Sequence, residues 1–324
     1  MRIGFLAGYW ASGPPKGVAD VFAAADDLGL DSLWTSESYG SDAFTPLAWW
    51  GAATSRTRLG TAVAQLSART PAATAMAAMT LDHLSGGRFV LGLGVSGPQV
   101  VEGWYGQRFD RPLERTREYV EIIRRVLRRE GPLEFSGRQF TLPLPTPQAK
   151  ALQANVRPLR ADLPIHLAAQ GPKNTALAAE IADGWLPAFF SPRLDAEYRR
   201  QLAEGFARRD DGARAASSFE VNVSLPVALG RDVEDAARLL APQVALYVGG
   251  MGSAEANFHR AVLERLGHED ACARIAARWA AGDRAGAAAA VPVELVLDVA
   301  LAGRPDQLAG QARRFDGTVA TGLL

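Results

Sequence analysis

The sequence has 324 residues, of which 48% are hydrophobic and 22% are charged, a balance typical of globular proteins. This length and composition exclude a wholly disordered chain and allow one large core. Lysine plus arginine and aspartate plus glutamate both number 35, so the formal net charge is zero. Such a balance gives no sign of a broad surface for nucleic acid or for a membrane.

Cysteine and histidine usage argues against disulfide and metal chemistry. Cys272 is the single cysteine, so an internal disulfide and a thiolate cluster are both excluded. The histidines lack the spacing of metal ligands, so we expect no metal site. No secretory signal opens the chain, and no apolar stretch reaches the roughly 18 residues of a membrane helix. We therefore expect a cytoplasmic protein that acts on a small molecule.

Short apolar runs alternate with helical patterns along the whole chain. The runs predict eight strands, at 2–7, 31–36, 58–63, 88–95, 164–168, 184–188, 219–229 and 318–324. Helical periodicity predicts helices at 18–28, 46–54, 71–84, 112–129, 173–182, 195–209 and 306–315, with an Ala-rich helical region at 231–293. Hydrophobicity is continuous over 88–95, as in parallel strands buried on both faces.

Eight repeated strand–helix units predict an α/β fold, a TIM-like (β/α)8 barrel with insertions. We expect one domain over residues 1–324, with insertions at about 130–163 and 245–290. Pro226 predicts that pairing ends early within 219–229. The last strand ends with the sequence, so either the helix that should follow it is missing by truncation or another helix covers that seam.

The active site of such a barrel lies at the C-terminal ends of its strands. Glu37 stands out there as a carboxylate just beyond an apolar strand, although it could instead be tied to a backbone group or an arginine. The small-residue loop 168–173 precedes a helix, whose N-terminus can bind an anion. A plain connecting loop is an equally good interpretation of 168–173 from the residues alone.

Two other chemistries fit the sequence poorly. The glycines of 92–97 (GLGVSG) begin inside a strand, and residues 98–112 are expected to form a long loop, so a dinucleotide fingerprint is rejected. A Gly-x-Ser-x-Gly motif is absent around Ser96, which argues against a serine hydrolase.

Four segments resemble a known family: 37–51 (ESYGSDAFTPLAWWG), 58–79 (RLGTAVAQLSARTPAATAMAAM), 82–106 (DHLSGGRFVLGLGVSGPQVVEGWYG) and 165–187 (IHLAAQGPKNTALAAEIADGWLP). They are similar to the luciferase-like monooxygenase superfamily and, within it, to actinobacterial F420-dependent oxidoreductases. The resemblance implies a TIM-like barrel with insertions, a cofactor at the C-terminal mouth (the deazaflavin coenzyme F420, or the flavin FMN as the alternative), and a homodimer.

The resemblance also implies residue roles. A non-proline cis peptide at Ala62-Val63 would back the deazaflavin ring, 95–99 would line it, and 168–173 would hold the phosphate of its tail. The expected cofactor contacts are Ala62, Val63, Gln65, Val95, Ser96, Gly97, Gln99, Ala168, Ala169, Gln170, Gly171, Pro172 and Lys173.

The sequence departs from the family pattern at the expected catalytic positions. Several members carry Asp-His where this chain has Glu37-Ser38, and others carry a glutamate where it has Ser96-Gly97. If a protein acid acts, Glu37 is the first candidate, followed by Tyr39 and Ser38. The substrate is expected near Trp10 and Trp49.

Three functions remain open at this point. The first is an F420-dependent oxidoreductase, mainly an F420H2-dependent reductase, that transfers a hydride between the deazaflavin C5 and an electrophilic carbon. The second is an FMN-dependent monooxygenase on the same scaffold. The third is a non-catalytic cofactor-binding paralogue.

Overall fold

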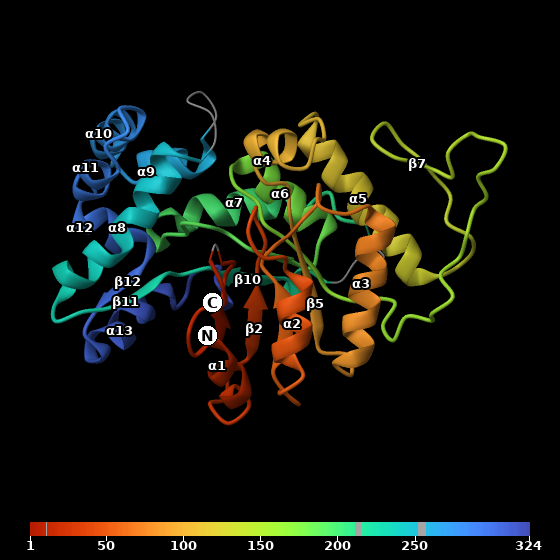
Figure 1. The fold of residues 1–324 in the computed structure, drawn as a ribbon, viewed down its shortest axis with the longest axis horizontal. Coiled ribbons are helices and arrows are strands. Elements are labelled where there is room, and N and C mark those ends of the chain that lie inside the picture. Colours follow the sequence, from red (N-terminus) through yellow and green to blue (C-terminus); the bar gives the residue numbers. More distant parts are fainter. Residues whose placement is uncertain (11, 211–214, 252–256) are drawn as a thin grey trace.

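The computed structural model describes residues 1–10, 12–210, 215–251 and 257–324, and its centre is a closed parallel barrel (Figure 1). Its strands run in the order β3-β2-β1-β13-β10-β9-β8-β5, and β5 pairs again with β3. The predicted eight-stranded barrel is therefore confirmed. The strands are β1 (Arg2–Leu6), β2 (Ser32–Thr35), β3 (Arg58–Thr61) with its continuation β4 (Ala64–Gln65), β5 (Phe89–Gly94), β8 (Ile165–Leu167), β9 (Gly184–Trp185), β10 (Glu220–Val223) and β13 (Gly322–Leu323).

The barrel closes where β3 meets β5. Gly60 lies opposite Val90, and the ladder resumes where Ala64 of β4 lies opposite Leu93. Between these points the Thr61 hydroxyl donates to the carbonyl of Gly92 at 2.8 Å and accepts from its N–H at 2.9 Å. The Thr61 side chain thus satisfies both backbone groups of Gly92, at the point that lies between the two paired stretches.

Helices connect successive strands and surround the barrel. The helices are α1 (Val18–Ala24), α2 (Phe44–Gly51), α3 (Pro71–Leu84), α4 (Pro98–Gly103), α5 (Pro112–Arg128), α6 (Pro172–Ile181), α7 (Asp195–Phe206), α8 (Val233–Gly249), α9 (Phe258–Arg265), α10 (Glu269–Ala280), α11 (Arg284–Ala289), α12 (Val293–Val299) and α13 (Pro305–Ala312). The prediction of a long loop at 98–112 was wrong in part, because Pro98 begins the short helix α4.

The strand predicted at 219–229 is divided by Pro226. Residues 220–223 form β10 in the barrel, whereas β11 (Val227–Leu229) pairs outside it with β12 (Leu301–Gly303). Proline has no N–H to donate to a ladder, so the chain leaves the barrel at this point. The strand β12 was not predicted, since three residues are too short to show a period.

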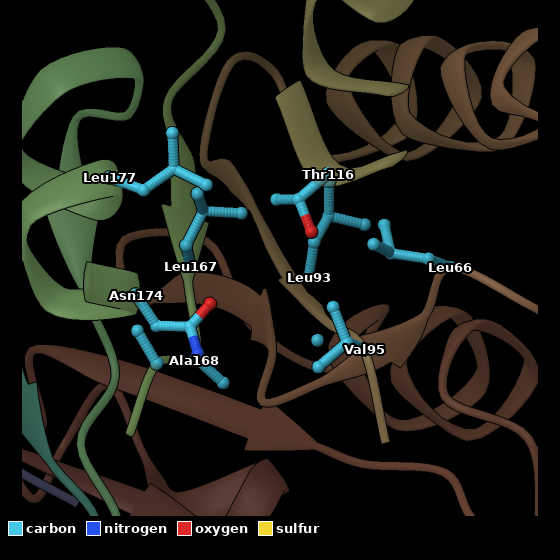
Figure 2. A pocket seen from close by; sticks show the side chains of 10 residues that line it. Leu66, Leu93, Val95, Thr116, Leu167, Ala168, Asn174 and Leu177 are labelled. Atoms are coloured by element: carbon cyan, nitrogen blue, oxygen red, sulfur yellow. The ribbon is translucent and has the colours of Figure 1, made fainter. Parts of the chain in front are cut away.

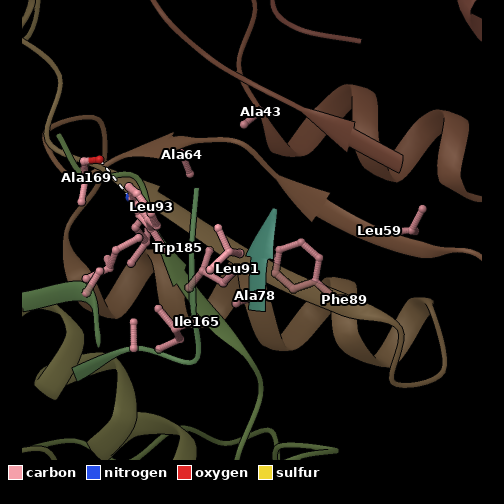
Figure 3. Close-up of a cluster of buried hydrophobic side chains, with 14 of the residues drawn as sticks. Ala43, Leu59, Ala64, Ala78, Phe89, Leu91, Leu93, Ile165, Ala169 and Trp185 are labelled. Atoms are coloured by element: carbon pink, nitrogen blue, oxygen red, sulfur yellow. Dashed lines mark hydrogen bonds between the residues drawn. The ribbon is translucent and has the colours of Figure 1, made fainter. Parts of the chain in front are cut away.

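The main core lies between the barrel strands and their covering helices. Its side chains include Leu91 and Leu93 from β5, Ile165 from β8 and Trp185 from β9, and all are nearly inaccessible (Figure 3). The indole N–H of Trp185 donates to the carbonyl of Ala169 at 2.9 Å. This bond ties the loop after β8 to the core directly beneath it.

Charged groups occupy the N-terminal end of the barrel. Glu220 accepts from Arg2 at 2.6 Å and from Arg58 at 3.0 Å, and Arg58 also pairs with Asp31 at 2.6 Å. His166 lies 3.8 Å from Glu220 and is fully buried. Catalytic chemistry in this fold occurs at the opposite end, so we assign these pairs to stability.

The two expected insertions differ in character. In 130–163, the antiparallel strands β6 (Phe135–Ser136) and β7 (Thr141–Leu142) form a hairpin, and the Glu118 carboxylate of α5 accepts from three N–H groups of its turn. Residues 245–290 fall mainly in α8 to α11, which pack around a second apolar cluster. Of this range, 252–256 lie outside the described residues. The assignment of 1–324 to one domain stays a prediction.

Candidate functional site at the C-terminal mouth of the barrel

The loops that follow the parallel strands meet at one end of the barrel. They comprise 7–10 after β1, 36–43 after β2, 62–63 between β3 and β4, 95–97 after β5, 168–171 after β8 and 186–190 after β9. In Figure 1, α4 lies above this end on one side, and α8 and α9 lie on the other. The expected site residues, except Trp49 on α2 and Gln65 in β4, fall on these loops or on the helix starts beside them.

The Glu37 carboxylate is engaged on all sides. It pairs with Arg69 at 2.7 and 2.9 Å and accepts from the backbone N–H of Gln65 at 2.7 Å and of Ala43 at 3.2 Å. Its side chain is 2% exposed. Glu37 therefore joins the loop after β2 to β4, to the start of α2 and to Arg69. This geometry favours a positioning role, the alternative that the sequence had left open.

The two residues after Glu37 are more accessible. Tyr39 is 54% exposed. Ser38 is half-buried, and its carbonyl accepts weakly from the Tyr105 hydroxyl at 3.5 Å. Burial raises the pKa of Tyr9 and the nearby Tyr39 phenol raises it further, whereas a hydrogen bond with Ser38 lowers it. The hydroxyl groups of Tyr9, Ser38 and Tyr105 thus lie at or beside the loop after β2.

The backbone between β3 and β4 has the expected unusual form. The peptide bond between Ala62 and Val63 is cis, at the position that the family resemblance implied. The Ala62 N–H donates to the carbonyl of Thr35, and the Val63 carbonyl accepts from the Glu37 N–H at 3.2 Å. Both residues are partly exposed at the mouth.

Gln65 supplies an unused acceptor beside this peptide. Its amide N–H donates to the Glu37 carbonyl at 3.1 Å, while its buried Oε1 lacks a hydrogen-bond partner among the described residues. A buried acceptor without a partner is unfavourable, so a ligand N–H would stabilise it. This feature fits a cofactor whose ring carries N–H donors, as deazaflavins and flavins do.

A hollow opens at the ends of β5 and β8 (Figure 2). Its lining combines Val95 and Ala168 from the strand ends with Thr116 of α5 and Asn174 of α6. A second hollow shares Leu66 and Val95 with the first and adds the cations Arg108 and Arg115. Ser96 and Gly97 lie beside these hollows, half-buried, and Ser96 has a φ of +61°. Gln99 in α4 is exposed.

The loop before α6 is braced on both sides. The Gln170 amide donates to the Ala188 carbonyl at 2.5 Å, and Asn174 donates to the Gln170 carbonyl at 3.1 Å. Gly171 has a φ of +78°, which only glycine adopts freely, and open space lies where its Cβ would be. Pro172 begins the helix, and Lys173 is exposed beside it. The N–H groups at the N-terminus of a helix and the charge of an exposed lysine beside it both favour binding of an anionic group.

The two expected substrate tryptophans do not come together. Trp10 follows β1 and contacts Trp50, with ring centroids 5.2 Å apart. Trp49 is 80% exposed on the outer helix α2, so the structure does not bring it to the mouth. The sequence named Trp49 and not Trp50, because it does not show which side of a short helix faces inward.

Several residues at the mouth were missed by the sequence analysis. Arg69 lies 32 positions from Glu37, and no local pattern connects them. Tyr247 and His259 fall in the Ala-rich region, which showed no interpretable motif, yet they contact Phe189 in the loop after β9. Only the closure of the barrel brings these groups together.

Neither a metal cluster nor a membrane span is evident in the described ranges. Their His, Cys, Asp and Glu side chains form no group of three that could hold an ion. No helix among them is both long and apolar enough to cross a bilayer.

Comparison with known proteins gives the family. Residues 3–322 match the family model described as luciferase-like monooxygenase. The chain belongs to this luciferase-like family. It is 51% identical over 315 residues to the Mycobacterium tuberculosis protein named "Putative coenzyme F420-dependent oxidoreductase Rv3520c", covering 96% of this chain and 90% of the relative. It is also 30% identical over 291 residues to the 5,10-methylenetetrahydromethanopterin reductase of Archaeoglobus fulgidus, covering 88% and 81%.

Several solved structures share the fold. The F420-dependent tetrahydromethanopterin reductase of Methanopyrus kandleri superposes with a TM-score of 0.81 at 24% identity, covering 100% of this chain and 92% of the other. An F420-dependent secondary alcohol dehydrogenase gives 0.74 at 16% identity, covering 99% and 92%. The FMN-containing 3,6-diketocamphane monooxygenase of Pseudomonas putida gives 0.65 at 19%, covering 100% and 90%. At these identities the likeness establishes the fold alone.

Proposed function

We propose that this protein is a coenzyme F420-dependent oxidoreductase that acts mainly as an F420H2-dependent reductase of a small organic substrate. The observation that carries the proposal is the 51% identity, over 96% of the chain, to a relative named as F420-dependent. The buried Gln65 Oε1, which lacks a hydrogen-bond partner among the described residues, supports the proposal, because it lies where a planar cofactor with N–H donors is expected. When bound, F420 supplies or accepts a hydride at C5, and it lacks the N5 with which a reduced flavin activates oxygen.

The chain's own residues would position the reactants and exclude water. Ala62, Val63 and Gln65 would contact the ring, together with 95–97 and Gln99, and 168–173 would hold the phosphate. Glu37 enters the proposal as a positioning residue, because its carboxylate is already engaged by Arg69. The hydroxyl groups of Ser38 and Tyr39 are then the candidates to hold or donate a proton at the substrate.

Fluorescence titration with F420 and with FMN tests the cofactor. We expect saturable F420 binding and much weaker FMN binding. If FMN binds tightly and F420 does not, the monooxygenase replaces the reductase as the proposed function. If F420 binds but its reduced form is not oxidised by any of a broad set of electrophiles, a non-catalytic cofactor-binding role replaces it.

Two lysines offer a matched test of the phosphate site. Lys173 lies at the start of α6, whereas Lys150 is equally exposed in the insertion at 130–163. We expect Lys173→Ala to weaken F420 binding about two- to fivefold, since an exposed ion pair contributes up to about 1 kcal/mol. Lys150→Ala should leave F420 binding unchanged. Neither variant should alter the affinity for the same deazaflavin without its phosphate tail. Equal effects of both variants on F420 would contradict this site.

A homodimer is part of the same proposal, and it rests on the family resemblance. Sedimentation equilibrium over a range of protein concentrations measures the mass directly. A monomer at every concentration would remove the dimer from the proposal and leave the cofactor site unaffected.

A further inference from the structure

A group of aromatic side chains lies on loops and helices at the mouth of the barrel. Tyr9 comes from the loop after β1, Tyr39 from the loop after β2, Tyr247 from α8 and His259 from α9. Phe189, in the loop after β9, packs its ring against Tyr247 at 5.2 Å and against His259 at 5.7 Å, both edge-on.

One asparagine places the two helical members side by side. The Asn257 amide donates to the carbonyls of Tyr247 at 2.8 Å and Val248 at 3.0 Å at the end of α8. Its Oδ1 accepts from the N–H groups of His259 and Arg260 at 3.0 Å and so caps α9. The Tyr247 and His259 rings consequently meet edge to face, with centroids 4.8 Å apart.

The loops after β1 and β2 face this helical pair. A Cβ on Gly40 would lie 2.4 Å from the Trp10 carbonyl and 3.4 Å from the Tyr9 ring, so these two loops are in close contact. Burial, together with the phenols of Tyr9 and Tyr39, raises the pKa of Tyr247 to about 12. Those phenols therefore lie near enough to Tyr247 to act on its charge.

One buried polar atom of this wall is available to a ligand. The buried Nδ1 of His259 has no hydrogen-bond partner within the described ranges. Burial lowers the pKa of His259 to about 4, so its imidazole is neutral at pH 7. A neutral imidazole and phenols can donate and accept hydrogen bonds while their rings cover an apolar surface.

The described segments that carry most of the wall are also uncharged. Lys, Arg, Asp and Glu are absent from residues 7–10, 38–41, 186–190 and 244–251. An anionic substrate group placed here would lose its hydration without gaining a cation, which is strongly unfavourable.

We propose that Tyr9, Tyr39, Tyr247 and His259 form the substrate-binding wall and that it selects neutral carbonyl compounds with a planar apolar body over anionic ones. This inference rests on the proposed function for the chemistry of the substrate, and it adds the substrate class. The carbonyl oxygen would accept from a phenol or the imidazole, and the planar body would lie against the rings.

A matched pair of probes tests the selection. The probes are 4-phenylbut-3-en-2-one and its para-carboxylate, which differ by one anionic group. Their affinities are measured by ligand-observed NMR, with the protein free and saturated with F420. We expect the neutral probe to bind at least about tenfold more tightly, because a charge is desolvated without a partner. Equal affinities, preference for the carboxylate, or no binding of either probe would overturn the inference.

Two variants of the wall test the contribution of its hydrogen bonds and the effect of its lack of charge separately. Tyr247→Phe should weaken binding of the neutral probe about three- to tenfold through loss of one hydrogen bond. Tyr198→Phe, which removes a buried phenol elsewhere, on α7, is the control and should have no effect. Tyr39→Lys changes an exposed residue, so folding is preserved, and it should shift the preference about tenfold towards the carboxylate. Unchanged preference in Tyr39→Lys would contradict the wall.

The outcome for the substrate-binding wall can be distinguished from the outcome for the cofactor. If the probes bind as expected but F420 does not, the proposed function fails and the wall stands. If F420 binds and the probes show no preference, the wall fails and the proposed function stands.

Discussion

At the scale of single residues, the Glu37–Arg69 pair is a largely buried ion pair at the mouth. The Glu37 side chain is 2% exposed and that of Arg69 is 24% exposed. Glu37→Gln leaves a largely buried guanidinium without its counter-charge, so we expect the free energy of unfolding in urea to fall by about 2 kcal/mol, below the range for fully buried pairs. Asp42→Asn, whose carboxylate lies 3.7 Å from Arg69 and is 41% exposed, should lower it by less than about 1 kcal/mol. Equal losses in the two variants would refute the positioning role of Glu37.

At the scale of elements, closure of the barrel depends on the close approach of β3 and β5. A Cβ at Gly92 would lie 1.8 Å from the Thr61 carbonyl oxygen, and backbone atoms would have to move. Gly92→Ala should therefore lower the free energy of unfolding by about 3 kcal/mol, the upper part of the range for overpacking. Gly103→Ala, at the end of α4, adds its Cβ to open space and should be within about 0.5 kcal/mol of the wild type. Equilibrium unfolding in urea measures both, and an unaffected Gly92→Ala would show that the strands can separate freely.

At the scale of the whole molecule, the buried histidine at the other end of the barrel makes stability depend on pH. Burial lowers the pKa of His166 to about 4, with Glu220 and Asp183 opposing the shift and Arg58 and Arg2 adding to it. Between about pH 6.5 and pH 4 the unfolded chain binds a proton at this residue that the folded chain does not. The free energy of unfolding should accordingly fall with decreasing pH, by up to about 1.4 kcal/mol per pH unit for this group.

Urea unfolding at pH 7, 6 and 5 measures this slope. His259, whose pKa burial also lowers to about 4, contributes in the same direction. His166→Gln should therefore reduce the slope without abolishing it. His83→Gln, which changes an exposed histidine on α3, should leave the slope unchanged. If the slopes of the wild type and His166→Gln are equal, the unfolded and folded chains bind protons alike at this position.

The sequence by itself determined the order and kind of most elements, because each depends on residues that are neighbours along the chain. The helix predicted at 71–84 has those bounds in the structure, since Pro71 fits the first turn and the Thr70 hydroxyl caps it. Continuous hydrophobicity marked β5, and Pro226 marked the end of β10. The family resemblance located the cis peptide at Ala62-Val63.

Only the tertiary structure decided which side chains act together at the mouth. Glu37 was prominent in the sequence, but its partner Arg69 and its restrained carboxylate became evident only in the closed barrel. Trp50 rather than Trp49 contacts Trp10. Tyr247 and His259 lie more than 200 residues from Tyr9 along the chain. Such contacts depend on how the eight strands close into a barrel, and a local sequence pattern does not show that closure. Periodicity could therefore predict the barrel but not which side chains form the wall of its site.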